Sequence, residues 1–194
     1  MKFYSITTVG GYAKAYYDLQ ESKEYICEKC ESVYLAERIA DYRVHFEGKK
    51  LGDFYRAPGC YIGNEKFIEM LEKYEITGYG VRGIDCTGWY DTRNNPIDID
   101  ASDLKEVVIL GTCGCMHDLD GNEIEKCENC DEVDFWVKKS IQGLSVPLDS
   151  WDGSDMFSFK NWQGVMICSE RVKDACEREK IKNVKFIPIE EITF

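Results

Sequence analysis

Residues 167–189, ICSERVKDACEREKIKNVKFIPI, align without a gap with residues 62–84, IGNEKFIEMLEKYEITGYGVRGI, at an offset of 105 residues. Five positions of the pair are identical, namely Ile62, Glu65, Glu72, Ile76 and Ile84 with Ile167, Glu170, Glu177, Ile181 and Ile189. Five identities in 23 positions carry little weight as statistics. The spacing of the apolar and capping residues, which both copies share, is the stronger signal.

Each copy has the pattern of a short amphipathic helix between two strands. Asn64 and Ser169 occupy N-cap positions, and a glutamate follows in the first turn, where the helix dipole favours negative charge. Apolar residues recur at helical spacing in both copies: Phe67, Met70, Leu71 and Tyr74 in the first, Val172, Ala175 and Cys176 in the second. Gly78 and Asn183 then suit a left-handed helix end, and an extended stretch follows.

The pattern predicts an α+β protein in which two related strand–helix–strand halves, approximately residues 1–100 and 101–194, form a single domain. The matched offsets suggest a pseudo-twofold axis between the halves. At 194 residues and 44% hydrophobic, the chain can bury a sizeable core. No stretch approaches the roughly 18 apolar residues of a membrane helix, and residues 1–20 lack the apolar core of a signal peptide. We therefore expect a cytoplasmic protein without a membrane partner.

The acidic side chains are concentrated between residues 118 and 134. The net charge of the chain is −12, and this segment alone holds eight carboxylates against the single Lys126. Nucleic-acid binding depends on basic residues that neutralise phosphates, so we expect no nucleic-acid partner. A basic protein would be attracted to such a segment. Taken alone, the charge is better explained by solubility than by a partner.

Two Cys-x-x-Cys pairs, Cys27 with Cys30 and Cys127 with Cys130, stand 100 residues apart. Ten cysteines in a chain without an export signal favour reduced thiols or metal ligands over disulfides. Four thiolates are the ligand set of a structural tetrahedral zinc site. The long segment between Cys30 and Cys127 adds little cost, because the entropic cost of closing a loop grows only logarithmically with its length. We therefore predict that Cys27, Cys30, Cys127 and Cys130 bind structural zinc.

A second ligand set lies within the segment ILGTCGCMHDLDGNEIEKCENC, residues 109–130. A hairpin turning at Asp120-Gly121 would lay Cys113 and Cys115 beside Cys127. Cys113, Cys115, Cys127 and Cys130, with His117 in reserve, would then hold zinc without the first pair. A third interpretation has no metal, with the cysteines as small buried residues. The first set is favoured because it uses both Cys-x-x-Cys pairs.

These motifs resemble those of the double-CXXCG motif family, the immunity proteins of bacterial polymorphic toxin systems. The similarity covers most of the chain. It begins with MKFYSITT at residues 1–8, includes both cysteine pairs and the GCMHDLDG segment, and is closest over residues 153–189, GSDMFSFKNWQGVMICSERVKDACEREKIKNVKFIPI. Glu31 and Asp131 stand where the family has glycine, the residue that best tolerates a positive φ in a metal knuckle. The first knuckle departs further, because glutamate tolerates that conformation less well than aspartate.

The resemblance implies binding and not catalysis: a cytoplasmic protein that docks on a cognate toxin, such as a basic nuclease domain, and neutralises it. Aromatic anchors are typical of such surfaces. Four aromatic residues near acidic or turn-rich stretches are candidates, namely Trp89, Tyr90, Trp151 and Trp162, although each taken singly is more often a core residue.

An enzyme is the competing interpretation. His45 lies in an alternating stretch typical of a half-buried strand residue, and His117 follows Cys115 by two positions. No nucleophile elbow, phosphate loop or His-Glu-x-x-His motif accompanies either histidine. A thioredoxin-like pair would open a helix, and no helix start follows Cys30. We expect no enzymatic activity; the alternatives are a free-standing zinc-binding protein and a Cys-His enzyme of unknown substrate.

Overall fold

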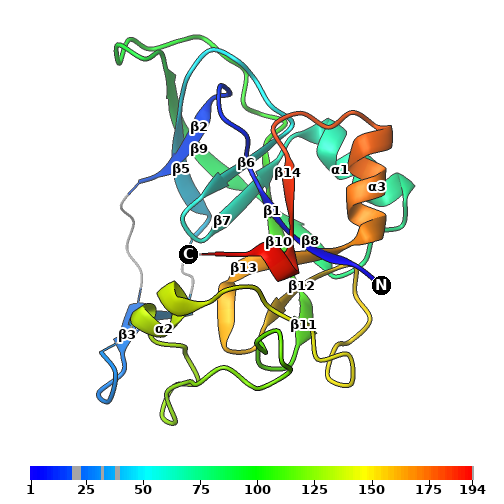
Figure 1. Cartoon of the computed structure of the whole chain (residues 1–194). Coiled ribbons are helices and arrows are strands. Elements are labelled where there is room, and N and C mark those ends of the chain that lie inside the picture. The colour runs from blue at the N-terminus through cyan, green and yellow to red at the C-terminus, as the bar shows by residue number, and fades with distance from the viewer. Residues whose placement is uncertain (19–22, 32, 38–39, 194) are drawn as a thin grey trace.

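A computed structural model describes residues 1–18, 23–31, 33–37 and 40–193 of the chain (Figure 1). The strands are β1 (Phe3–Thr7), β2 (Lys14–Tyr17), β3 (Lys23–Ile26), β4 (Val33–Glu37), β5 (Tyr42–Glu47), β6 (Phe54–Ala57), β7 (Cys60–Gly63), β8 (Tyr79–Arg82), β9 (Ile84–Tyr90), β10 (Lys105–Ile109), β11 (Gly111–Cys113), β12 (Met156–Phe159), β13 (Trp162–Ser169) and β14 (Lys185–Pro188). The helices are α1 (Glu65–Lys73), α2 (Phe135–Ser140), α3 (Glu170–Arg178) and the 3-10 helix η1 (Ile189–Glu191). The fold is mixed α+β, as the sequence predicts, and both aligned segments form strand–helix–strand units.

Two sheets contain the repeated units, and all of their strand pairs are antiparallel except β11 with β12, which is parallel. In one sheet the strand order is β11-β12-β13-β1-β14, and in the other it is β6-β7-β10-β8. Strands β12, β13 and β14 of the first sheet correspond to β6, β7 and β8 of the second. The middle strand that pairs with both neighbours is β1 in the first sheet and β10 in the second.

The two middle strands are exchanged between the halves of the chain. Strand β1, from the N-terminal half, lies between β13 and β14 of the C-terminal half. Strand β10, which opens the C-terminal half, lies between β7 and β8 of the N-terminal half. Each half therefore supplies the strand that completes the sheet of the other half.

Helices α1 and α3 and one face of each repeated sheet form a central hydrophobic core. Its buried members include Phe67 and Leu71 of α1, Val172 and Cys176 of α3, and Ile6 of β1. The helices lie side by side at one edge of the molecule (Figure 1). The outer face of the β6-β7-β10-β8 sheet packs on the three-stranded β2-β5-β9 sheet. The outer face of the five-stranded sheet packs on a second core, formed with residues of the 113–144 segment.

The chain leaves both helices through the same backbone conformations. Glu75 and Lys180, the second residue beyond α1 and α3, have positive φ angles of 48° and 53°. Three residues later Gly78 and Asn183 also have positive φ, 84° and 66°. The helices thus end five residues before the glycine and asparagine that the sequence suggested as their terminators. At Gly78 a Cβ atom would overlap the carbonyl oxygen of Met156, so glycine is required there for close packing as well.

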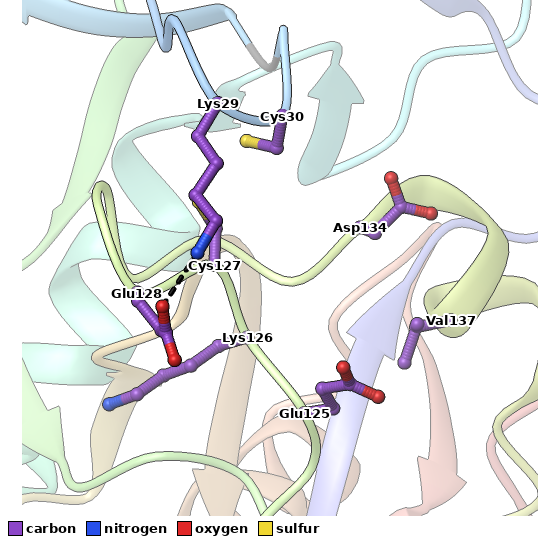
Figure 2. Close-up of a pocket in the computed structure, with 8 residues that line it drawn as sticks. All are labelled: Lys29, Cys30, Glu125, Lys126, Cys127, Glu128, Asp134 and Val137. Atoms are coloured by element: carbon purple, nitrogen blue, oxygen red, sulfur yellow. Dashed lines mark hydrogen bonds and ion pairs between the residues drawn. The ribbon is translucent and has the colours of Figure 1, made fainter.

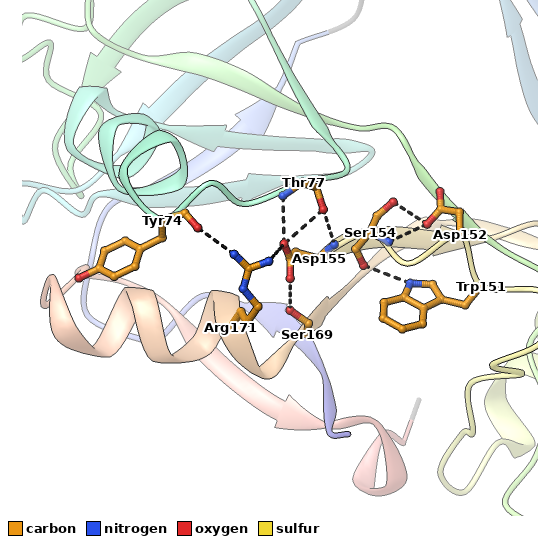
Figure 3. A network of polar contacts seen from close by, with 8 residues as sticks. All are labelled: Tyr74, Thr77, Trp151, Asp152, Ser154, Asp155, Ser169 and Arg171. Atoms are coloured by element: carbon orange, nitrogen blue, oxygen red, sulfur yellow. Dashed lines mark hydrogen bonds and ion pairs between the residues drawn. The ribbon is translucent and has the colours of Figure 1, made fainter.

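Asp155 joins the two halves through a buried polar network (Figure 3). Its carboxylate accepts hydrogen bonds from the Ser169 hydroxyl at 2.7 Å and from the Arg171 guanidinium at 2.7 Å, both in the C-terminal half. It also accepts from the backbone N–H of Thr77 in the N-terminal half at 3.1 Å. The Asp155 side chain is 6% exposed, so these donors replace nearly all of its water.

Asp53 holds the corresponding position in the N-terminal half. Its carboxylate accepts from Asn64 at 3.2 Å and from Lys66 at 3.3 Å, and from the backbone N–H of Lys182 at 2.7 Å. Asn64, Lys66 and Lys182 are each 105 residues from the partners of Asp155. Each aspartate therefore contacts the helix start of its own half and the post-helix turn of the other half. Such reciprocal contacts are those of an isologous, twofold-related interface.

No helix within the described ranges is long and apolar enough to cross a membrane.

Candidate metal centre

Both Cys-x-x-Cys pairs form tight turns of the same geometry. We call residues 27–31 the first knuckle and residues 127–131 the second knuckle. In each, the backbone N–H of the fifth residue donates to the carbonyl of the first cysteine, from Glu31 to Cys27 at 2.8 Å and from Asp131 to Cys127 at 2.9 Å. Glu31 and Asp131 have φ angles of 57° and 61°. The left-handed conformation for which the related motif uses glycine is therefore present here without glycine.

Neighbouring elements position the two knuckles. The first lies at the turn between β3 and β4, which form a two-stranded ribbon. The second lies shortly before α2, whose N-cap Asp134 accepts from the backbone N–H of Trp136 at 2.8 Å. Ribbon and α2 lie next to one another at one end of the molecule (Figure 1).

The four cysteines of the predicted set converge. The Sγ atoms of Cys27 and Cys127 are 3.8 Å apart, those of Cys30 and Cys130 are 3.5 Å apart, and all four lie within 4.8 Å of one another. In a tetrahedral site with Zn–S bonds of about 2.3 Å the sulfur atoms are about 3.8 Å apart. The residues present therefore fit a four-coordinate metal ion, and the predicted clustering of Cys27, Cys30, Cys127 and Cys130 is confirmed.

The electrostatics of the cluster favour a bound cation. The Asn129 amide donates to Cys27 Sγ at 3.3 Å, and this hydrogen bond lowers the pKa of the Cys27 thiol to about 6. Burial raises the pKa of Cys130 to about 12. Thiols this close cannot all ionise together unless a positive charge compensates them. A divalent metal ion supplies that charge, because it binds the deprotonated form of each ligand.

The competing ligand set is not assembled. Among the residues that the structure describes, Cys113, Cys115 and His117 belong to no group of potential ligands. The turn predicted near Asp120-Gly121 is present, since Asp118 and Asn122 are joined by a backbone hydrogen bond of 2.9 Å. Cys113, however, is buried in the core, and Cys115 Sγ instead accepts from the Lys126 ammonium at 3.1 Å.

Half of the carboxylates of the acidic segment pair with lysines. Four of its eight carboxylates form ion pairs, Glu123 and Asp131 with Lys126, Glu128 with Lys29, and Glu132 with Lys138. Asp118 and Asp134 accept hydrogen bonds from backbone N–H groups at a turn and a helix start. The segment is thus a less negative surface than its sequence suggests, since several of its partner lysines come from outside it.

The candidate aromatic anchors are mostly packed against the cores. Trp89 is 5% exposed and stacks on Phe46 with ring centroids 4.4 Å apart, so its suggested exposure is wrong. Tyr90, Trp151 and Trp162 are half-buried. Trp136 is 71% exposed, more than any other aromatic side chain that the structure describes, and the sequence interpretation did not select it. The four-residue spacing of Val133, Val137 and Ile141, which pack in the second core, could have identified it, because Trp136 falls off that face.

His45 is a half-buried residue of β5, as expected from its alternating strand. Its Nδ1 atom lies 2.7 Å from a carboxylate oxygen of Asp18, and its ring stacks on Tyr16.

No protein-family model matches the chain, and no curated protein sequence matches it. The cysteine cluster is therefore the feature of this chain that indicates a function, namely metal binding.

A matched pair of substitutions tests how the knuckles tolerate their left-handed residues. Replacing Glu31 with glycine is expected to stabilise the metal-loaded protein by about 0.5 kcal/mol, because glycine adopts a positive φ without strain. The same change at Asp131 is expected to destabilise it by about 0.5 kcal/mol, because the Asp131 carboxylate pairs with Lys126 at 3.2 Å and Lys160 at 3.3 Å. Urea unfolding of both variants measures the two signs; equal effects would contradict this account.

Proposed function

We propose that this protein is an immunity protein that binds and neutralises a cognate toxin domain, with a structural zinc ion cross-linking its two halves. The observation that carries the proposal is the convergence of four cysteine sulfur atoms from segments 100 residues apart. A cross-link of this kind holds a surface in a fixed shape, which an inhibitor that acts by docking requires.

Zinc is proposed because of the ligand chemistry. Four thiolates in tetrahedral arrangement suit zinc, whereas carboxylate and carbonyl oxygens suit magnesium and calcium. With four protein ligands the coordination sphere has no position for a substrate, which favours a structural over a catalytic ion. In the loaded site Cys27 and Cys30 would hold the β3-β4 ribbon against the second knuckle, and the Asn129 amide would fix the orientation of Cys27 Sγ.

The immunity role is proposed from the family resemblance together with the place of its motif residues. Asp155, Ser169 and Arg171 belong to the segment where the resemblance is closest, and they form one network with Thr77 of the other half. These side chains are hydrogen-bonded to one another across the two halves, so they act in holding the two repeats together. A shared motif of this structural kind is compatible with relatives that bind different toxins through different surfaces.

Zinc analysis of a single variant tests the ligand assignment. The purified protein is expected to contain one equivalent of zinc, and Cys30→Ser is expected to reduce zinc content at least tenfold after dialysis, because one of four ligands is lost. Cys86→Ser is the control: this cysteine lies on β9 outside the cluster and should keep its zinc. Full zinc retention by Cys30→Ser would rule out the proposed ligand set.

Affinity purification from the native host tests the immunity role. The tagged protein, isolated at low salt, is expected to carry a stoichiometric partner with a toxin domain, identified by mass spectrometry. Recovery of the protein alone, also when the neighbouring reading frames are co-expressed, would contradict the proposal. A free-standing zinc-binding protein or an enzyme using Cys115 and His117 would then be the better interpretation.

A further inference from the structure

A cavity of about 430 Å³ opens directly beside the cysteine cluster. Its walls come from both knuckles and from α2, and they include Lys29, Cys30, Cys127 and Val137. Figure 2 shows Lys29 and Cys30 on one side of the cavity, with Asp134, Val137 and Glu125 across from them. Because its walls belong to segments 100 residues apart, the cavity exists only while the two knuckles are held together. The metal site and the cavity are therefore one structural unit.

The charges around the cavity are negative in sum once the metal is bound. A zinc ion with four thiolates carries a formal charge of −2, and two of those thiolates, Cys30 and Cys127, line the cavity. The Lys29 ammonium is neutralised by Glu128 at 2.6 Å. Lys126 is held by two carboxylates of its own, and its ammonium points away from Glu125 (Figure 2).

Two further carboxylates of the cavity wall are left without a counter-charge. Glu125 and Asp134 form no ion pair with any residue of the described ranges, and Asp134 uses its side chain only to cap α2. Both residues lie across the cavity from Lys29 and Cys30 (Figure 2). A ligand that enters here meets anionic groups on two sides and the apolar Val137 side chain beside Asp134. Those groups select a cation.

Two exposed apolar side chains lie close in sequence to residues of the cavity wall and its metal ligands. Ile26, which ends β3 immediately before Cys27, is 64% exposed, and Trp136 of α2 is 71% exposed. Trp136 lies in sequence between the cavity residues Asp134 and Val137. Tryptophan is among the residue types enriched in interface hot spots.

We propose that this cavity receives an arginine side chain of the partner protein, with Ile26 and Trp136 packed on its apolar neighbours. The proposal rests on the toxin-binding function proposed above and names the end of the molecule that docks. A guanidinium group suits the site better than an ammonium group: its planar fork matches carboxylates, and it is more weakly hydrated and so loses less on entering a cavity. The charge on the metal cluster makes docking at this end dependent on bound zinc.

Titration of the zinc-loaded, ¹⁵N-labelled full chain with N-acetyl-arginine amide tests the cavity without the toxin. At low salt we expect saturable shifts of the Cys30, Asp134 and Val137 amide signals at millimolar ligand concentration. N-acetyl-citrulline amide, which has the same shape and no charge, should bind at least fivefold more weakly. Equal shifts with both ligands, or no shift with either, would overturn the proposal.

A double variant and a control variant complete the test. Glu125→Gln combined with Asp134→Asn should weaken arginine-amide binding about tenfold, and asparagine preserves the helix cap at position 134. Glu69→Gln, on the exposed face of α1, removes one charge far from the cavity and should leave binding unchanged. Undiminished binding by the double variant would overturn the assignment. Zinc content is measured on the same samples. A zinc-loaded protein that does not bind arginine amide would contradict only the proposed arginine site. A protein that does not bind zinc would contradict the proposed cross-link.

Discussion

Removing the metal is expected to lower the unfolding temperature of this protein by about 10–20 °C. In the proposed site the ion would join segments that otherwise contribute little to the three hydrophobic cores, so its loss should cost about 5 kcal/mol, less than the roughly 10–16 kcal/mol with which zinc folds a zinc-finger peptide. For a chain of this size, 1 kcal/mol corresponds to about 2–4 °C. Calorimetry of the purified protein before and after chelation measures the shift.

The loss of protection should be local before it is global. After chelation, amide hydrogen exchange is expected to accelerate in β3, β4 and the second knuckle, because both knuckles lose their shared anchor. Strands β1 and β10 should keep their protection, since each pairs on both sides with strands of the other half. Cys86→Ser provides the matched control and should show the same metal-dependent shift as the unmodified chain. An unfolding temperature that does not respond to chelation would remove the metal from any structural role.

Replacing Asp155 with alanine is expected to destabilise the protein by about 3 kcal/mol. The substitution removes the acceptor for Ser169, Arg171 and the Thr77 N–H, and a buried donor left without a partner costs about 1–3 kcal/mol. The Arg171 side chain is 60% exposed and can be rehydrated, so the loss should fall short of that for a fully buried ion pair. Urea unfolding measures the change.

Two further variants separate the network from a general effect of charge removal. Glu177 is a residue of α3 whose carboxylate pairs with Lys173 at the surface. Glu177→Ala removes only this pair and should change stability by less than about 0.5 kcal/mol. Asp53→Ala should resemble Asp155→Ala, because Asp53 makes the reciprocal contacts in the other half. A loss below about 1 kcal/mol for both aspartate variants would show that the two networks do not hold the halves together.

Local patterns in the sequence predicted α1, α3 and the cysteine cluster, but neither α2 nor the arrangement of the sheets. The caps and apolar spacing of α1 and α3 lie within nine-residue segments, and the Cys-x-x-Cys turns are equally local. The exchange of β1 and β10 is a pairing between strands that are distant in sequence. The alternation of apolar and polar residues in a strand does not predict which strand pairs with it. Asp53 and Asp155 were missed because they stand 102 residues apart, outside the gap-free alignment at 105.

Side-chain exposure was the least predictable part of the candidate site. Trp89 lies in a turn-rich, polar stretch, yet its strand places it on the core face, with Phe46 and Tyr55 beside it. The acidic segment gave no sign that Lys29 and Lys160, far away in sequence, would pair with it. Both errors have one cause: burial and ion pairing depend on which distant segments meet, and that follows from topology.

The exchanged strands also constrain how the chain is synthesised. Strand β1 leaves the ribosome first, but its partners β13 and β14 follow only after residue 162. At about 5–20 residues per second, β1 waits about 8–30 s with both edges unpaired. Unpaired strand edges invite association with other chains. The nascent protein is therefore exposed to aggregation until its last strands emerge, and its cellular yield should depend on chaperones that shield the N-terminal strand during that interval.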